Sequence, residues 1–173
     1  MGAYIIKATI RGSKPPVWRR IQVPDRITFG DLHEILQICF GWDGYHLHAF
    51  MAPFGTIGPD DDSDVNEDEL IIDECPRNMT YIYDFGDNWE HKIVFEKYDP
   101  DIISRSPKVL KWKGDNFNED VGGVYGAMMM MEDEEFKEDE DEDEDEDEEW
   151  SATYPFDLDF VNEQLSGMRL RIR

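Results

Sequence analysis

Three of the four histidines of this chain lie in predicted β-strands near acidic residues. His46 and His48 are two residues apart in the predicted strand 45–51, so both rings should project from the same face. Asp87 lies in a predicted turn, and His91 lies on the strand that follows it. If the two strands are neighbours, the four side chains converge. Two or three histidines with a carboxylate suit zinc, manganese or non-haem iron, which makes a metal-dependent enzyme one hypothesis.

The strand that contains His91 favours a different role for this histidine. His91 shares its face with apolar residues, namely Trp89, Ile93 and Phe95, so we expect its ring to point into the core. Buried histidines usually have a hydrogen-bond partner, and the turn residues Asp84 and Asp87 are the expected neighbours. We therefore favour a structural polar cluster over a divalent metal site, and we predict no cofactor.

Two adjacent arginines are candidates for binding an anion. Trp18, Arg19 and Arg20 lie in the middle of a predicted strand, and either guanidinium has the donors to hold a carboxylate or a phosphate. Because the chain is so acidic, we favour a salt bridge instead, with Trp18 in the core. The expected carboxylate partners are Asp84, Asp87, Glu119 and Asp120.

Glu119 and Asp120 are a further pair of candidate residues, because they precede the flexible Gly122–Gly123 pair. Two adjacent carboxylates suit metal binding or acid–base chemistry, although a turn or a helix N-terminus explains them equally well. The chain has no Gly-rich phosphate loop, no Gly-x-Ser-x-Gly elbow and no Cys-x-x-Cys pair. No residue stands out as a catalytic nucleophile.

The elements that must position these residues are predicted from periodicity. Alternation over 4–11 and 17–23 predicts a β-hairpin. Residues 28–40 predict a helix, which begins with the capping box of Thr28 and Asp31 and ends at Gly41. After this helix we expect a long polar loop at 53–69, a short element at 70–72 and a second hairpin from 80–83 and 89–97. An irregular segment at 99–118 and a helix opened by the methionines at 128–131 should follow. The last expected elements are a helix through 160–165, capped by Asp157 or Asp159, and a terminal strand at 168–173.

Charge and composition indicate one α+β domain over residues 1–173, made of mixed antiparallel hairpins packed with a few helices. The net charge is −24, but 16 of the 41 acidic residues lie in 132–149. Such a run repels itself, so we expect a flexible acidic insertion that aids solubility or binds a basic protein, and its deletion should leave the fold intact. The negative field disfavours direct binding to duplex DNA. With no secretory signal and no apolar run long enough for a membrane span, we expect a cytoplasmic protein without membrane contact.

Several short motifs together resemble one known family. The most specific is the segment 81–91, which contains Tyr83-Asp84-Phe85-Gly86-Asp87-Asn88-Trp89-Glu90-His91. The segments that agree in the same order are 16–20, 32–33, 40–42, 46–50, 119–123 and 160–162. Over about residues 4–165 the chain resembles the Ri-plasmid open-reading-frame-three-like family, whose members are sometimes labelled as transposon passenger proteins of a TnpR type. The resemblance implies an α+β domain and no established activity.

Three functions remain open from the sequence. The favoured hypothesis is a non-catalytic binding or adaptor domain, because no catalytic constellation is evident. The alternatives are a metal-dependent enzyme that uses the His/Asp cluster, and an accessory protein of mobile-element DNA, which follows only from the family label. The candidate binding residues are Trp18, Arg19, Arg20, His46, His48, Asp84, Asp87, Trp89, His91, Glu119 and Asp120.

Overall fold

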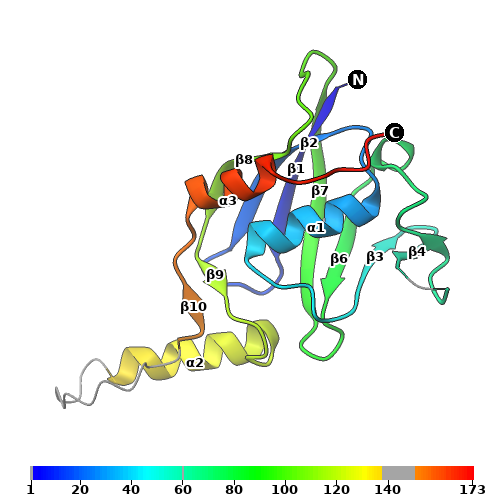
Figure 1. Cartoon of the computed structure of the whole chain (residues 1–173). Helices are drawn as coiled ribbons and strands as arrows, with labels where there is room; N and C mark the ends of the chain where they lie inside the picture. The colour runs from blue at the N-terminus through cyan, green and yellow to red at the C-terminus, as the bar shows by residue number, and fades with distance from the viewer. Residues whose placement is uncertain (1, 60, 138–150) are drawn as a thin grey trace.

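The fold is an eight-stranded β-sheet with two helices packed on one of its faces (Figure 1). The computed structural model describes residues 2–59, 61–137 and 151–173. Neighbouring strands are antiparallel except for the parallel outermost pair, β5 and β4. In spatial order the strands are β5 (Val65–Asn66), β4 (Gly55–Gly58), β3 (His48–Ala52), β6 (Met79–Tyr83), β7 (Trp89–Asp99), β1 (Ala3–Ile10), β2 (Trp18–Pro24) and β8 (Lys108–Lys113). The predicted α+β single domain is confirmed.

Both predicted hairpins are present and form the middle of the sheet. β1 pairs with β2, β6 pairs with β7, and the two hairpins join where β1 pairs with β7. Alternate residues of β1 are buried, including Ile6, Ala8 and Ile10, because successive side chains of a strand point to opposite faces. The hydrophobic core therefore lies between one face of the sheet and the helices.

Helix α1 (Phe29–Phe40) covers the middle of this face, as predicted. Thr28 accepts a hydrogen bond from the backbone N–H of Asp31, and the Asp31 carboxylate accepts one from the backbone of Thr28. This capping box satisfies backbone donors that a helix N-terminus otherwise leaves free. Gly41 ends the helix with φ = 74°, a left-handed conformation that glycine adopts without steric cost.

Helix α3 (Leu158–Ser166) lies on the same face as α1 (Figure 1). Asp157 caps it, as one of the two predicted alternatives, and Val161 and Leu165 face the core. The predicted terminal strand at 168–173 is wrong, because this segment forms no strand. The backbone N–H of Arg171 donates a hydrogen bond to the Asp31 carboxylate, and the backbone N–H of Arg173 donates one to the Arg26 carbonyl.

Two regions that were expected to lack regular structure contain strands. The predicted loop 53–69 contains β4 and β5, and the segment 99–118 contains β8 and β9 (Asn116–Phe117), which pairs with β10 (Thr153–Tyr154). A short 3-10 helix at Ile72–Glu74 follows the first of these regions. β8 was missed because five of its six residues are exposed. An edge strand of this kind lacks the alternation of polar and apolar residues on which the prediction depends.

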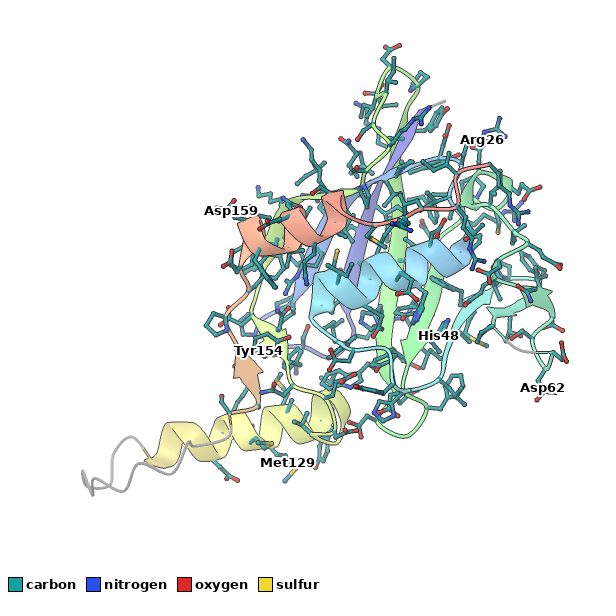
Figure 2. The ribbon with its side chains drawn as sticks, in the orientation of Figure 1. Arg26, His48, Asp62, Met129, Tyr154 and Asp159 are labelled. Carbon is teal, nitrogen blue, oxygen red and sulfur yellow. The ribbon has the colours of Figure 1, made fainter. Side chains whose placement is uncertain are left out.

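Helix α2 (Gly123–Lys137) begins five residues before the methionine run that was expected to open it. It includes the first residues of the acidic run, and the rest of the predicted flexible insertion, 138–149, lies outside the described residues. Figure 2 shows Met129 on the side of α2 away from the sheet, and its side chain is exposed. Within the described part of the chain, no helix is long and apolar enough to cross a membrane.

Candidate functional site

His46, His48, Asp87 and His91, the candidates of the metal hypothesis, do not come together as one group among the described residues. β3 begins only at His48, so His46 lies in the preceding loop and the two rings do not share a strand face. The Nε2 atom of His48 lies 2.7 Å from Glu67 Oε2. Asp87 accepts a hydrogen bond from a backbone N–H, and Nδ1 of His91 lies 3.1 Å from a backbone carbonyl oxygen. The expectation that His46 and His48 share a face was wrong, because the alternation of side chains applies only within a strand.

His91 is buried, as predicted, but its neighbours are aromatic rings and not the turn aspartates. Its Nδ1–H donates to the Tyr81 carbonyl, and its ring centroid lies 4.8 Å from that of Phe40 and 5.3 Å from that of Trp42. Burial lowers the pKa of His91 to about 4, so the ring is neutral at pH 7. Trp89 is also fully buried. Both residues therefore belong to the core.

A second histidine network connects α1 with the sheet, and the sequence did not predict it. His33 Nδ1 lies 2.6 Å from the Tyr81 hydroxyl, which also accepts a hydrogen bond from Gln37. The His33 ring stacks on that of His48, the first residue of β3, which Figure 2 labels near α1. The signal that could have located this network is the helical spacing of Phe29, His33 and Gln37, which places His33 on the inner side of α1.

Arg19 is fully buried and makes no salt bridge among the described residues, contrary to the prediction. Its guanidinium donates to the backbone carbonyls of Cys39, Trp18 and Lys113 and to the side-chain oxygen of Asn116. Burial lowers the pKa of Arg19 to about 10, which leaves it protonated at pH 7. A buried charge surrounded by carbonyl oxygens has a structural role, because four of the five N–H donors are already used and the side chain is not accessible to a ligand.

Trp18 and Arg20 lie on the opposite face of β2 from Arg19, so the predicted core position of Trp18 is also wrong. The amino group of Lys7 and the guanidinium of Arg20 lie 4.5 and 5.1 Å from the Trp18 ring. Arg20 also forms an ion pair with Glu96 at 2.7 Å. Alternation explains the arrangement, because an inward Arg19 requires both of its neighbours to point outward.

The structure brings together a different set of candidates, His46, Asp84 and Asp120. His46 Nε2 lies 3.0 Å from Asp120 Oδ1 and 3.6 Å from Asp84 Oδ2. One donor atom from each residue lies within 4.8 Å of the other two. The three residues come from the loop before β3, the β6–β7 turn and the loop before α2, which meet at one end of the sheet (Figure 1). Only the fold makes them neighbours.

The β6–β7 turn holds Asp84 in a defined orientation. Oδ1 of Asp84 accepts hydrogen bonds from the backbone N–H groups of Gly86 and Asp87, at 2.9 and 3.2 Å. The backbone N–H of Asp84 donates to the carbonyl of Leu47, which connects the turn to the loop that contains His46. With Oδ1 used by the turn, Oδ2 is the oxygen directed at His46. The buried position of Asp84 keeps this carboxylate in place.

The loop before α2 packs closely on the same turn. The backbone N–H of Gly122 donates to the Asp87 carboxylate, and a Cβ atom at Gly123 would lie only 2.1 Å from the Asp87 carbonyl oxygen. The Tyr83 hydroxyl donates to the Glu119 carboxylate. Burial and this hydrogen bond raise the pKa of Tyr83, so the hydroxyl keeps its proton. The predicted candidates Glu119 and Asp120 therefore belong to the same site as Asp84.

Large exposed apolar side chains adjoin this cluster in the chain. Tyr45 and Leu47 flank His46, and Phe85 follows Asp84. Tyr45 is 83% exposed, and Leu47 and Phe85 are each more than half exposed. Tyr125, in the first turns of α2, is exposed as well. Residues 45–47, 83–88 and 119–125 are hereafter called the loop end of the sheet, and they combine a fixed polar cluster with exposed apolar groups.

The chain matches known proteins over nearly its whole length. Residues 2–164 match the model of the family described as plasmid pRiA4b ORF-3-like protein. An uncharacterized protein, y4hQ of Sinorhizobium fredii, is 36% identical over 130 residues, which are 70% of this chain and 67% of that protein. The crystal structure of MM3350, a protein of unknown function from Methanosarcina mazei Go1, is 34% identical with a TM-score of 0.77, covering 92% of this chain and 97% of that one. This chain belongs to the plasmid pRiA4b ORF-3-like protein family.

Proposed function

We propose that this protein is a non-catalytic binding or adaptor domain that contacts a partner protein through the loop end of the sheet. The observation that supports this most directly is the set of exposed side chains Tyr45, Leu47 and Phe85 beside a cluster held by hydrogen bonds. Exposed apolar residues are common singly, but a group of them around fixed polar residues is typical of interaction sites. Tyrosine is also among the residues that contribute most to binding energy.

The loop end is also rigid enough to bind without a large entropic cost. Asp84 connects the β6–β7 turn to Leu47, Gly122 binds Asp87, and Tyr83 binds Glu119. These contacts hold all three segments in place before any partner arrives. Binding then requires little further ordering of backbone, which for a flexible loop costs about 1–2 kcal/mol per residue.

The charge of the loop end favours a basic partner segment. Asp87, Glu119 and Asp120 lie on it, and the whole chain has a net charge of −24. Such a field attracts lysine- and arginine-rich surfaces and accelerates their association, whereas it repels phosphate backbones. The proposed partner is therefore a protein segment that combines basic and apolar side chains.

Site-specific photo-crosslinking tests this proposal. A photoreactive p-benzoylphenylalanine replaces Tyr45 in one variant and Ile103 in a second, and both are irradiated in extract of cells that express the protein natively. The two native side chains are equally exposed, at 83%, so the control matches accessibility while lying outside the loop end. We expect a discrete crosslinked protein with a basic segment from position 45 and none from position 103.

The purified partner then provides the quantitative test. We expect Tyr45→Ala and Phe85→Ala each to weaken binding at least tenfold, equivalent to about 1.4 kcal/mol, while Ile103→Ala changes it less than threefold. Salt should weaken binding as well, because the charges are exposed. Equal crosslinking from positions 45 and 103, or an affinity that Tyr45→Ala leaves unchanged, would disprove the proposal.

A further inference from the structure

We infer that His46, Asp84 and Asp120 bind one divalent transition-metal ion, with Zn²⁺ as the preferred ion, at the loop end of the sheet. The inference goes beyond the proposed function, because ion binding needs only these three side chains and no partner. An imidazole nitrogen with two carboxylate oxygens is a donor set that zinc and manganese accept, whereas magnesium and calcium prefer oxygen donors alone.

The distances between the donor atoms suit a single ion. Zinc bonds of roughly 2.0–2.2 Å place neighbouring donors about 3–3.6 Å apart in a four-coordinate site. His46 Nε2 lies 3.0 Å from Asp120 Oδ1 and 3.6 Å from Asp84 Oδ2. These two distances match that spacing, and all three donor atoms lie within 4.8 Å of one another.

The surroundings of the three residues orient them as the supporting contacts of a metal site do. The turn occupies Oδ1 of Asp84 with two backbone N–H groups, which leaves Oδ2 free to bind an ion. The His46 ring packs edge-on against Tyr83, and the His46 backbone N–H lies 3.4 Å from the Tyr83 hydroxyl. Tyr83 in turn donates to Glu119, the residue next to Asp120. Asp84 and His46 are therefore held by separate contacts, and Asp120 follows a residue that is bonded to Tyr83.

The charge of the cluster also suits a divalent ion. The Asp120 and Asp84 carboxylate oxygens lie 3.0 and 3.6 Å from Nε2 of His46. A divalent ion between them neutralises both carboxylates and makes direct bonds to all three donors.

Three protein donors leave a coordination position open. Asp120 is 71% exposed, so the ion would be accessible to solvent on this side. Zinc sites with three protein ligands hold a water molecule or an external ligand in the fourth position. A ligand group of a partner, such as a carboxylate or an imidazole, has the chemistry to take this position.

Isothermal titration calorimetry of the full-length protein tests the inference. The protein is stripped with EDTA and titrated with ZnCl₂ at pH 7.5, and CoCl₂ is added in parallel to read the visible absorption of Co²⁺. Asp120→Asn removes one donor while keeping the size of the side chain, and asparagine tolerates the left-handed backbone of this position, φ = 58°. Asp62→Asn is the matched control, because Asp62 is also exposed and lies outside the loop end (Figure 2).

We expect one zinc site per chain, at least 100-fold weaker binding in Asp120→Asn and in His46→Gln, and a change of less than threefold in Asp62→Asn. The Co²⁺ spectrum should show the intense visible bands of a four-coordinate site in the native protein and lose them in both donor variants. Binding that is equal in the native protein, Asp120→Asn and Asp62→Asn would show only diffuse attraction to acidic residues and would overturn the inference. The proposed function is tested separately: if position 45 still crosslinks to the partner in EDTA, partner binding stands even when the zinc inference fails.

Discussion

The imidazole ring of His33 lies flat on that of His48, with the ring centroids 3.3 Å apart and the planes inclined by 5°. His48 binds the buried Glu67, whereas His33 binds the hydroxyl of Tyr81. Burial, together with the neighbouring His48, lowers the pKa of His33 to about 3. His33 is therefore neutral at pH 7, and protonating it would place a positive charge in a buried, stacked position.

We predict that mild acid destabilises the protein through His33 and His91. Their pKa values in the folded state are lowered to about 3 and about 4, whereas an unfolded histidine has a pKa near 6.5. The unfolded chain thus binds more protons below pH 6.5, so the stabilisation is complete above that pH and is lost as the pH falls toward 4. Each histidine contributes a slope of about 1.4 kcal/mol per pH unit in this window.

Urea denaturation at pH 7.5 and pH 5.5 measures this effect. Most carboxylates stay ionised over that range, so they contribute little to the difference. We expect the free energy of unfolding to be about 3 kcal/mol lower at pH 5.5. In His91→Gln the loss should be about half as large, because one of the two groups no longer titrates. An unchanged free energy between the two pH values would contradict the assignment of both histidines as neutral.

The neighbouring arginines of β2 should differ sharply in their contribution to stability. Arg19→Met leaves three carbonyls and the Asn116 oxygen without their donor in the core, so we expect a loss of at least about 3 kcal/mol. Arg20→Met removes a partly exposed ion pair with Glu96 and a cation–π contact with Trp18, so it should cost about 1 kcal/mol or less. Thermal and urea denaturation of the two variants provide the comparison. Equal losses would show that the hydrogen bonds of Arg19 are not what stabilises this part of the fold.

Gly123→Ala should loosen the loop end. The new Cβ atom would collide with the Asp87 backbone, and φ = 69° at this position is unfavourable for alanine by about 1–2 kcal/mol. We expect a lower melting temperature and a zinc affinity reduced at least tenfold, since Asp120 could no longer hold its position. Gly167→Ala is the control, because its Cβ would meet only ordinary contacts. A Gly123→Ala protein with native stability would argue against close packing of the loop on the turn.

The acidic residues of 138–149 should be dispensable for folding. Replacing them with alternating Gly and Ser removes 12 carboxylates and reduces repulsion without changing the chain length. We expect the melting temperature to stay within a few degrees, whereas affinity for poly-L-lysine should fall at least tenfold in 50 mM salt. A large drop in melting temperature would mean that the run supports the folded domain. If the variant bound poly-L-lysine as tightly as the native protein does, the loop end alone would account for the binding of basic partners.

Local patterns were sufficient to predict the regular elements at the centre of the fold. Thr28 and Asp31 begin α1 and Gly41 ends it, because these caps depend only on neighbours in the chain. The alternation in 4–11 and 17–23 predicted the first hairpin, and the alternation of Trp89, His91 and Ile93 in the second hairpin predicted that His91 points inward. The strands that the sequence missed, such as β8, lie at edges, where burial does not impose a pattern.

The candidate site depended on contacts that no local pattern contains. The sequence identified Asp84, Glu119 and Asp120 as candidates, but it paired Asp84 with His91 and all three carboxylates with the arginines of β2. Only the packing of the loop before β3 and the loop before α2 against the β6–β7 turn brings His46 between Asp84 and Asp120. Periodicity predicts which way a side chain points within one element. The distance between two loops depends instead on how all the strands that connect them pair with one another, and no local pattern contains that information.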